Sequence, residues 1–322
     1  MLKIFTVTFP FFALVLAGYV AARRRYLPLE AIPGLNGFVL FFALPCMLYR
    51  FGASTPVAQL LDMSVALTWL LCGLIVVGFT VATSLNARIG WNDAAFGALV
   101  AAFPNSGFMG VPLLVALLGA QAAGPAILTM AIDMLVITSL CIALSRLDGA
   151  DEHGAAKALK NALKGVLTNP MPWAILLGAM ASVLAFELPG PVAKVVGMLA
   201  DAASPVALFT IGAVLARSQM LAASGHAAAP LLRDYLPVAL LKLFLHPLLV
   251  LLIGVTLTRL GLPLDPFALT VVVLVAALPS ASNVSLLAER FGADNGRVAR
   301  IILVSTAAAF VTFSLTVGLL LP

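Results

Sequence analysis

The stretch AAFPNSGFMGVP, residues 101–112, interrupts a long apolar run with Pro104, Asn105, Ser106, Gly107 and Gly110. Proline has no N–H to donate and its ring obstructs the preceding helical turn, so a helix must open at Pro104. At membrane depth, opened backbone is tolerated only where it is buried in protein or lines a polar cavity. The stretch therefore predicts a membrane helix that is broken near its middle around a polar site.

The composition supports the membrane interpretation. Hydrophobic residues make up 62% of the 322 residues and charged residues 10%, whereas soluble proteins carry about 25% charged residues. The apolar runs are long and continuous, which indicates helices rather than a membrane barrel. The net charge of +5 comes from short loops and forms no basic domain, which argues against a nucleic-acid-binding protein. The cysteines lie within apolar runs without metal or disulfide spacing, and no metal site or cofactor is predicted.

Crossing about 30 Å of hydrocarbon takes about 20 helical residues. Ten such segments are expected, at 2–22, 32–51, 62–85, 94–118, 124–145, 170–188, 194–216, 236–259, 267–288 and 298–321. The expected fold class is therefore an all-α integral membrane protein with ten transmembrane helices.

The loops predict how these spans are oriented. With the N-terminus outside, the inner loops hold 13 basic residues: Arg23, Arg24, Arg25, Arg88, Arg146, Lys157, Lys160, Lys164, Arg217, Arg233, Arg290, Arg297 and Arg300. The outer ends and loops hold 4, which are Lys3, Arg50, Lys194 and Arg259. Positive residues accumulate on the cytoplasmic side, so both termini are expected on the other side.

A polar stretch divides the spans into five plus five. We expect a first repeat at 1–145, a cytoplasmic loop with a short amphipathic helix at 146–169, and a second repeat at 170–322. A block of five spans reverses the direction of the chain, so the second repeat is expected to be inverted. Mid-span prolines match between the repeats: Pro45 with Pro205, and Pro104 with Pro279. Inverted repeats with interrupted helices in corresponding positions are typical of secondary transporters.

The two breaks near the membrane midplane predict the substrate site. Each second half-helix would present free N–H groups and its positive dipole end at the break, and two such ends form an anion site. The alternative is that each proline only kinks its helix, which fits either proline alone better than the matched pair. The predicted substrate-binding residues are Pro104, Asn105, Ser106, Gly107, Pro279, Ser280, Ser282 and Asn283.

The chain resembles the auxin efflux carrier family, which includes bacterial carriers of the malate and malonate type. The resemblance rests on FPNSGFMGVPLL (103–114), TNP (168–170), LKLFLHPLLV (241–250) and LPSASNVSLLAERFG (278–292), and extends over essentially the whole chain. It implies a scaffold and dimer face of spans one, two, six and seven. It also implies a transport bundle of spans three to five and eight to ten, in which spans four and nine cross at their prolines.

This sequence departs from the family at the second crossing. The plant members carry a Pro-Asn pair at the first crossing, which Pro104 and Asn105 match. At the second crossing the chain has Pro279 followed by Ser280, and Asn283 comes later. The long cytoplasmic loop of the plant members is absent, so regulation by phosphorylation of such a loop does not carry over.

Ionisable residues within predicted spans are costly to bury and usually functional. Asp133 in span five and His246 in span eight fall at nearly the same depth, and Lys242 starts about 6 Å closer to the cytoplasm. Lys242 and His246 share a helix face. Asp133 with Lys242 or His246 is expected to form either a proton or charge relay or a structural ion pair. Asp201 falls in the scaffold spans, where a structural role is expected.

The sequence favours a transporter over other classes. No metalloprotease, nucleophile-elbow or phosphate-loop motif occurs, which argues against an enzyme. A channel or receptor remains a minor alternative. Among transporters, the alternative is a sodium-coupled organic anion symporter of the bile-acid carrier type, although neither crossing contains the acidic ligand that such sites often use.

The expected substrate is a small organic anion, a carboxylate or a dicarboxylate such as malonate or malate, moved by an elevator-like alternating-access mechanism. The direction of transport and coupling to H⁺ or Na⁺ stay open. The resemblance further implies a homodimer in the bacterial inner membrane.

Overall fold

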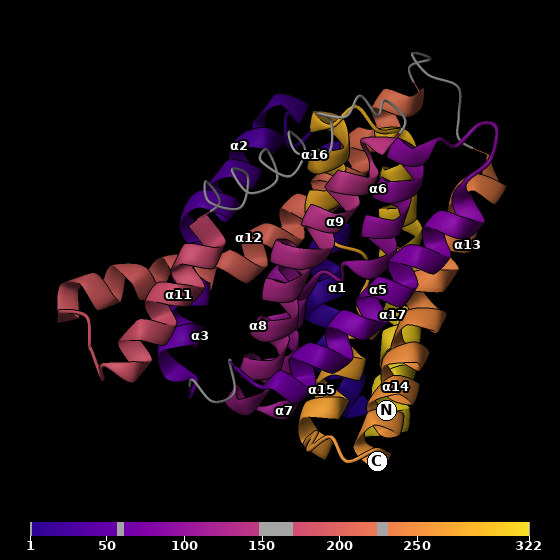
Figure 1. The fold of residues 1–322 in the computed structure, drawn as a ribbon. Coiled ribbons are helices and arrows are strands. Elements are labelled where there is room, and N and C mark those ends of the chain that lie inside the picture. Colours follow the sequence, from indigo (N-terminus) through magenta and orange to yellow (C-terminus); the bar gives the residue numbers. More distant parts are fainter. Residues whose placement is uncertain (1, 57–60, 148–169, 224–230, 322) are drawn as a thin grey trace. The chain divides into compact units, whose positions relative to one another are not determined.

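The computed structural model describes residues 2–56, 61–147, 170–223 and 231–321 (Figure 1). Within these ranges every regular element is a helix, and the one β-type pairing is an isolated bridge between Pro104 and Ser280. The all-helical prediction is therefore confirmed. The amphipathic helix expected around Lys157 and the TNP opening at 168–169 lie outside the described residues.

Six helices in the described ranges are long and apolar enough to cross a membrane: Leu29–Ser54, Met63–Ser84, Ala120–Leu144, Gly190–Arg217, Leu232–Arg259 and Asn295–Leu320. Four shorter apolar helices accompany them: Thr8–Arg23, Ser106–Leu118, Trp173–Val183 and Pro266–Ala277. The molecule is thus built as a multi-pass membrane protein. The full set of ten spans, and their arrangement as inverted repeats, stays a prediction.

The chain divides into two compact units, each made of three separate segments. Unit 1 consists of Met1–Asp62, Gly107–Leu128 and Asn169–Ala227, and unit 2 of Met63–Ser106, Thr129–Thr168 and Ala228–Pro322. Both units draw on the first and the second half of the sequence, so neither half folds as a domain by itself.

Unit 1 contains α1 (Leu2–Arg23), η1 (Leu29–Ala31), α2 (Ile32–Phe38), η2 (Val39–Ala43), α3 (Leu44–Ser54), α7 (Val111–Leu118), η4 (Ala120–Ala122), most of α8 (Ala123–Ile132), α11 (Pro170–Val183) and α12 (Gly190–Ala223). Helix α1 packs along α12, and α3 packs along α11. A Cβ on Gly18 would overlap the backbone of Phe209, and one on Gly212 would overlap the backbone of Val15. Small residues let membrane helices approach this closely, so the two glycines account for the α1–α12 contact.

Unit 2 contains α5 (Met63–Ser84), α6 (Trp91–Ala102), η5 (Asp133–Ile137), α9 (Thr138–Leu144), α13 (Leu232–Leu240), η7 (Leu241–Leu245), α14 (His246–Arg259), α15 (Pro266–Ala277), α16 (Asn283–Arg290) and α17 (Asn295–Leu320). Helix α5 packs on α6 and α14, and α13 packs on α17. Figure 1 shows α5 and α6, in purple, beside the helices from the end of the sequence, in orange and yellow.

In the described part of the chain, four π-helical turns widen the helices, and three of them have the same local cause. Turns η2, η3 (Ser106–Gly110) and η7 are each followed, two residues later, by a proline: Pro45, Pro112 and Pro247. A proline cannot donate to the carbonyl four residues before it, so the helix relaxes to a wider turn there. At η5 no proline follows at that distance, and the hydroxyl of Thr138 instead donates to the carbonyl of Asp133 at 2.8 Å.

The two prolines predicted as a matched pair in spans two and seven leave their helices unbroken. Pro45 lies in the first turn of α3, directly after η2, and Pro205 lies within the continuous helix α12. Pro104 and Pro279 lie outside any helix. The interruptions of the described helices at matched prolines are therefore confined to the second pair.

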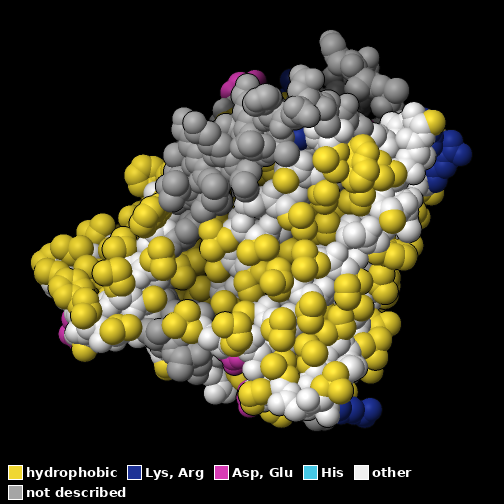
Figure 2. Space-filling view, viewed as in Figure 1, with side chains coloured by type: hydrophobic (Ala, Val, Ile, Leu, Met, Phe, Trp, Pro, Cys, Tyr) yellow, Lys and Arg dark blue, Asp and Glu magenta, His cyan; other side chains and the backbone are white. Residues whose placement is uncertain are grey.

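Large apolar side chains are exposed on both units, among them Trp173 and Met180 of α11 and Leu248 and Leu252 of α14. Figure 2 shows hydrophobic side chains over much of the visible face, with few charged side chains among them. A soluble monomer rarely exposes apolar patches of this extent, whereas a lipid-facing surface requires them.

Candidate functional site

The first break opens helix α6 at its carboxyl end. Helix α6 ends at Ala102, and Phe103 takes an extended conformation with φ −98° and ψ 101°. Helical structure resumes at Ser106, as the π-turn η3 and then α7. Three residues, 103–105, therefore lie outside regular helix, centred on the proline that the sequence identified.

The second break opens α15, and the backbones of the two breaks pair with each other. Helix α15 ends at Ala277, and α16 begins at Asn283. The N–H of Asn105 donates to the carbonyl of Pro279 at 2.8 Å, and the N–H of Ala281 donates to the carbonyl of Phe103 at 2.9 Å. These two bonds form the antiparallel bridge between Pro104 and Ser280. Backbone groups that the prolines release from their helices thus find partners in the opposite break.

A third helix completes the backbone pairing. The N–H of Ser280 donates to the hydroxyl oxygen of Ser305 in α17 at 3.2 Å, and that hydroxyl donates to the carbonyl of Ile302 at 3.0 Å. Ser305 is fully buried. The sequence analysis did not identify it, although a serine within an apolar helix is a signal for an interhelical hydrogen bond.

Two polar side chains at the breaks are buried, and one of them has no partner in the described part of the chain. Asn105 is 4% exposed and Ser280 is 1% exposed. The Ser280 hydroxyl has no hydrogen-bond partner among the described residues. Ser282 and Asn283 are partly exposed. Buried polar groups are nearly always hydrogen-bonded, so the Ser280 hydroxyl has unused capacity to bind a ligand.

The predicted site residues therefore meet in part. Asn105, Ser106, Ser280, Ser282 and Asn283 gather around the paired breaks within unit 2. Ser106 makes a long hydrogen bond of 3.4 Å from its hydroxyl to the carbonyl of Pro104. Gly107 belongs to unit 1, so it is not assigned to the same cluster.

The charged residues within the helices form a second cluster, which includes a tryptophan. Asp133, Lys242 and His246 are all buried, with 0%, 0% and 1% exposure. Nε1 of Trp69 donates to Oδ1 of Asp133 at 2.8 Å, and the ring of Trp69 lies 5.2 Å from that of His246. No direct ion pair joins Asp133 to Lys242 or His246 among the described residues. Asp133 is therefore held by Trp69, which the sequence analysis missed although a buried indole N–H needs an acceptor.

Lys242 connects the charged cluster to the second break. Its Nζ donates to the carbonyl of Ala276 at 2.6 Å and lies 3.3 Å from Nδ1 of His246. Ala276 is in the last turn of α15, immediately before the break. Oδ2 of Asp133 and Nε2 of His246 have no partner among the described residues. The prediction that Lys242 and His246 share a helix face is consistent with their contact, but the sequence did not identify the carbonyl of α15 as the acceptor of Lys242.

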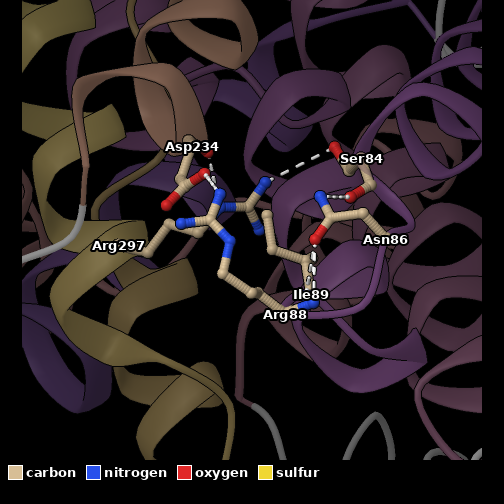
Figure 3. Close-up of polar contacts among 6 residues, drawn as sticks. All are labelled: Ser84, Asn86, Arg88, Ile89, Asp234 and Arg297. Atoms are coloured by element: carbon tan, nitrogen blue, oxygen red, sulfur yellow. Dashed lines mark hydrogen bonds and ion pairs between the residues drawn. The ribbon is translucent and has the colours of Figure 1, made fainter.

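A third polar cluster surrounds Arg297 near the start of α17 (Figure 3). Arg297 is 2% exposed, and its guanidinium donates to the carbonyl of Asp234 at 2.7 Å and to the hydroxyl of Ser84 at 3.4 Å. It also donates to the carbonyl of Asp93 at 2.7 Å. Beside it, Nη2 of Arg88 meets Oδ1 of Asp234 at 2.9 Å. The sequence placed Arg297 in a loop, whereas α17 already begins at Asn295.

Asp201, for which the sequence suggested a structural role, forms an ion pair. Its carboxylate accepts from Nη1 of Arg50 at 2.7 Å, linking α12 to α3 within unit 1, and both side chains are exposed. The pair lies outside the unit that holds the breaks.

Comparisons with known proteins cover nearly all of the chain. A family model described as "Membrane transport protein" matches residues 3–317. A Rhizobium meliloti (strain 1021) protein named "Putative malonate transporter" is 29% identical over 97% of this chain and 94% of its own length. An "Uncharacterized transporter" of Methanothermobacter thermautotrophicus is 28% identical over 94% and 93%. "Uncharacterized transporter YfdV" of Escherichia coli (strain K12) is 26% identical over 88% and 86%.

Proposed function

Because this chain belongs to the membrane transport protein family, whose model matches residues 3–317, we propose that it is a secondary transporter that moves a small organic anion by alternating access. The family match bears out the resemblance to the auxin efflux carriers. The family and the named relatives are transporters rather than enzymes. The proposal concerns the substrate class, the site and the mechanism.

One observation carries the proposal: two broken helices pair their backbones and leave the buried Ser280 hydroxyl without a partner among the described residues, beside the buried Asn105. Burying an unpaired polar group costs free energy, so an arrangement that serves folding alone would fill these hydrogen bonds or use apolar residues. Asn105 has an amide that donates two hydrogen bonds, and Ser280 has a hydroxyl that donates one. A carboxylate offers two oxygens that accept such bonds. The breaks therefore match an anion.

The helix ends favour the same charge. The helical segment that resumes at Ser106 and the helix α16 that begins at Asn283 both start at the breaks. The free N–H groups and the positive dipole end of a helix amino terminus attract anions. The substrate-binding residues that we propose are Pro104, Asn105, Ser106, Gly107, Pro279, Ser280, Ser282 and Asn283.

The Rhizobium relative suggests which anion to test first. Its printed name assigns it malonate, and it is similar to this chain along nearly its whole length. Malonate has two carboxylates, which would engage the polar groups of both breaks. We therefore propose a short dicarboxylate, with malonate ahead of malate, as the substrate.

The mechanism that we propose is elevator-like. Such a mechanism requires the substrate site and the coupling groups to travel together on one body. The paired breaks and the cluster of Asp133, Lys242 and His246 all lie in unit 2. The scaffold and the homodimer contact are assigned to spans one, two, six and seven by analogy with the family.

The topology that we propose has ten spans in two inverted repeats, 1–145 and 170–322, in a bacterial inner membrane. The 13-to-4 distribution of basic residues supports an orientation with both termini outside and the 146–169 loop in the cytoplasm. Reporter fusions at both termini and within the loop test this arrangement. Opposite locations of the two termini would rule out an even number of spans.

The direct test is uptake of labelled organic acids into proteoliposomes, at several pH values and with or without Na⁺. We expect saturable malonate uptake that counterflow accelerates and that does not require Na⁺. Absence of saturable uptake of every short carboxylate would contradict the proposed substrate class. Strict dependence on Na⁺ would favour the bile-acid carrier type instead.

Asp133 is the residue that we propose carries a coupling proton. Asp133→Asn keeps the oxygen that accepts from Trp69 but removes the acidic group. We expect uptake driven by a pH gradient to be abolished, while exchange of internal for external malonate is retained. Asp201→Asn, the same change at an exposed carboxylate of unit 1, is the matched control and leaves both activities intact. Unchanged gradient-driven uptake in Asp133→Asn would make the residue structural.

A further inference from the structure

The contact between Lys242 and Ala276 has no explanation in substrate binding or proton coupling. Lys242 is fully buried, and its Nζ donates to the Ala276 carbonyl at 2.6 Å. An ammonium is strongly hydrated in water, so burying it is costly unless negative groups surround it. The role of the Lys242 ammonium can therefore be inferred from the negative groups around it.

The Ala276 carbonyl is one that the break leaves open. In an uninterrupted helix it would accept from the N–H of Ser280, four residues later. That N–H donates instead to the hydroxyl of Ser305 in α17. The carbonyl also belongs to the last turn of α15, where the helix dipole adds partial negative charge. Lys242 therefore supplies both the missing hydrogen bond and a compensating positive charge.

Asp133 adds an acidic group to the same cluster. Its Oδ1 accepts from Trp69, and its Oδ2 has no partner among the described residues. The ring of Trp69 lies 5.2 Å from that of His246, whose Nδ1 is 3.3 Å from Nζ of Lys242. A carboxylate oxygen, an open carbonyl and a helix carboxyl end are the surroundings that hard cations prefer. Without the ammonium, they would form an uncompensated negative cluster inside the unit.

We propose that Lys242 is a positioning residue that serves as the built-in cation of the second break, in a place that would otherwise bind a monovalent cation from solution. It holds the end of α15, and with it Pro279 and Ser280, in the geometry that pairs with Pro104. The effect on the substrate rests on the proposed function, whereas the latent cation site does not. The protein therefore needs no external cation to form its anion site.

Shortening the side chain tests this directly. Lys242→Ala leaves space beside Asp133 and the Ala276 carbonyl. We expect its unfolding temperature in detergent to rise on adding Na⁺ or ethylammonium in place of the bulky N-methylglucamine ion, while the wild-type temperature stays constant. Malonate affinity should fall about tenfold or more in N-methylglucamine buffer and recover with ethylammonium. Purified, monodisperse protein is used for both measurements.

Lys242→Met is the matched control, because it removes the charge but keeps the volume. We expect weakened malonate binding that no cation restores. If Lys242→Ala does not fold, the double variant Asp133→Asn with Lys242→Met removes both buried charges. It should then bind malonate about tenfold more weakly than the wild type, in every buffer.

The outcomes separate the two proposals. Lys242→Ala that is folded but shows no cation-dependent stabilisation overturns the built-in cation, whatever the substrate is. Wild-type malonate affinity in Lys242→Ala without small cations, or in the double variant, also overturns it. Cation-dependent stabilisation of Lys242→Ala in a protein that binds no organic acid supports the latent site and contradicts the proposed function instead.

Discussion

The Arg297 cluster and the paired breaks are both buried polar regions of unit 2, yet they use their polar groups differently. At Arg297, Nε, Nη1 and Nη2 each have an acceptor, and the residue also lies in the first turn that Asp294 caps. At the breaks the backbone is paired, but the buried hydroxyl of Ser280 has no partner among the described residues. The Arg297 cluster joins α5, α6, α13 and α17. The breaks, in contrast, keep hydrogen-bonding capacity for a ligand.

The difference gives a criterion that separates structural from functional polar groups inside a membrane protein. Burial and charge alone do not separate them, since Arg297 and Asn105 are both almost fully buried. The state of the hydrogen bonds does, because a satisfied network stabilises the fold and an unsatisfied one costs free energy until a ligand arrives. Substitutions in the two regions should therefore affect different measurements.

The largest expected effect is on stability, from Arg297→Met. The variant removes a buried charge and leaves the carbonyls of Asp93 and Asp234 without that donor. We expect a loss of about 3 kcal/mol or more in the free energy of unfolding, measured by denaturation in detergent. Gly97 leaves room for the guanidinium, so Gly97→Ala should destabilise in the same direction. If Arg297→Met is as stable as the wild type, the Arg297 cluster does not stabilise the fold.

The next effect is on binding, from Asn105→Ala. Losing a hydrogen bond to a charged group costs about 1.5–3 kcal/mol, or roughly ten- to a hundredfold in affinity. We expect malonate affinity to fall by that factor, with the unfolding temperature unchanged. Asn283→Ala should act in the same direction. Ser145→Ala, whose hydroxyl donates to the Ile142 carbonyl within its own helix, is the control. Wild-type affinity in both Asn variants would mean that the breaks are kinks without a ligand.

Smaller effects are expected from Ser280 and Ser305, which are joined by the hydrogen bond from the Ser280 N–H to the Ser305 hydroxyl. Ser280→Ala removes a hydroxyl without a described partner, so stability should not fall, while malonate affinity should drop by about fivefold. Ser305→Ala removes the acceptor of the Ser280 N–H and should destabilise by about 1–3 kcal/mol. The reverse pattern, with stability lost at Ser280 and kept at Ser305, would contradict both assignments.

The smallest effect is expected at Arg88, beside the Arg297 cluster. Its side chain is 46% exposed and pairs with Asp234 through one contact. Exposed ion pairs contribute about 0–1 kcal/mol, so Arg88→Met should change the free energy of unfolding by no more than that. Because the same denaturation experiment reports on Arg297→Met, the two variants together measure what burial adds to an arginine contact.

Features that depend on local chemistry could be predicted from the order of the residues. Long apolar runs predicted helices because a membrane-crossing backbone must satisfy its own hydrogen bonds. Pro104 and Pro279 predicted breaks because proline withholds a donor and blocks the preceding turn, and the described helices end two residues before each of them. Asn105 and Ser280 were identified because polar groups at such a break are costly without a purpose.

The hydrogen-bond partners of the buried polar groups, by contrast, depend on how the helices pack. Pro45 and Pro205 were predicted as a matched pair of mid-span prolines. However, α12 continues through Pro205, and Pro45 follows a π-turn without interrupting its helix. Asp133 accepts a hydrogen bond from Trp69 and forms no ion pair with a described basic residue, and Lys242 donates to a carbonyl of α15. Arg297, which the sequence analysis assigned to a loop, lies in a buried hydrogen-bond network. A proline acts on its own helix and is visible in one segment of sequence. A partner is chosen by the faces that separate helices present to each other, and that is settled only when the whole unit packs.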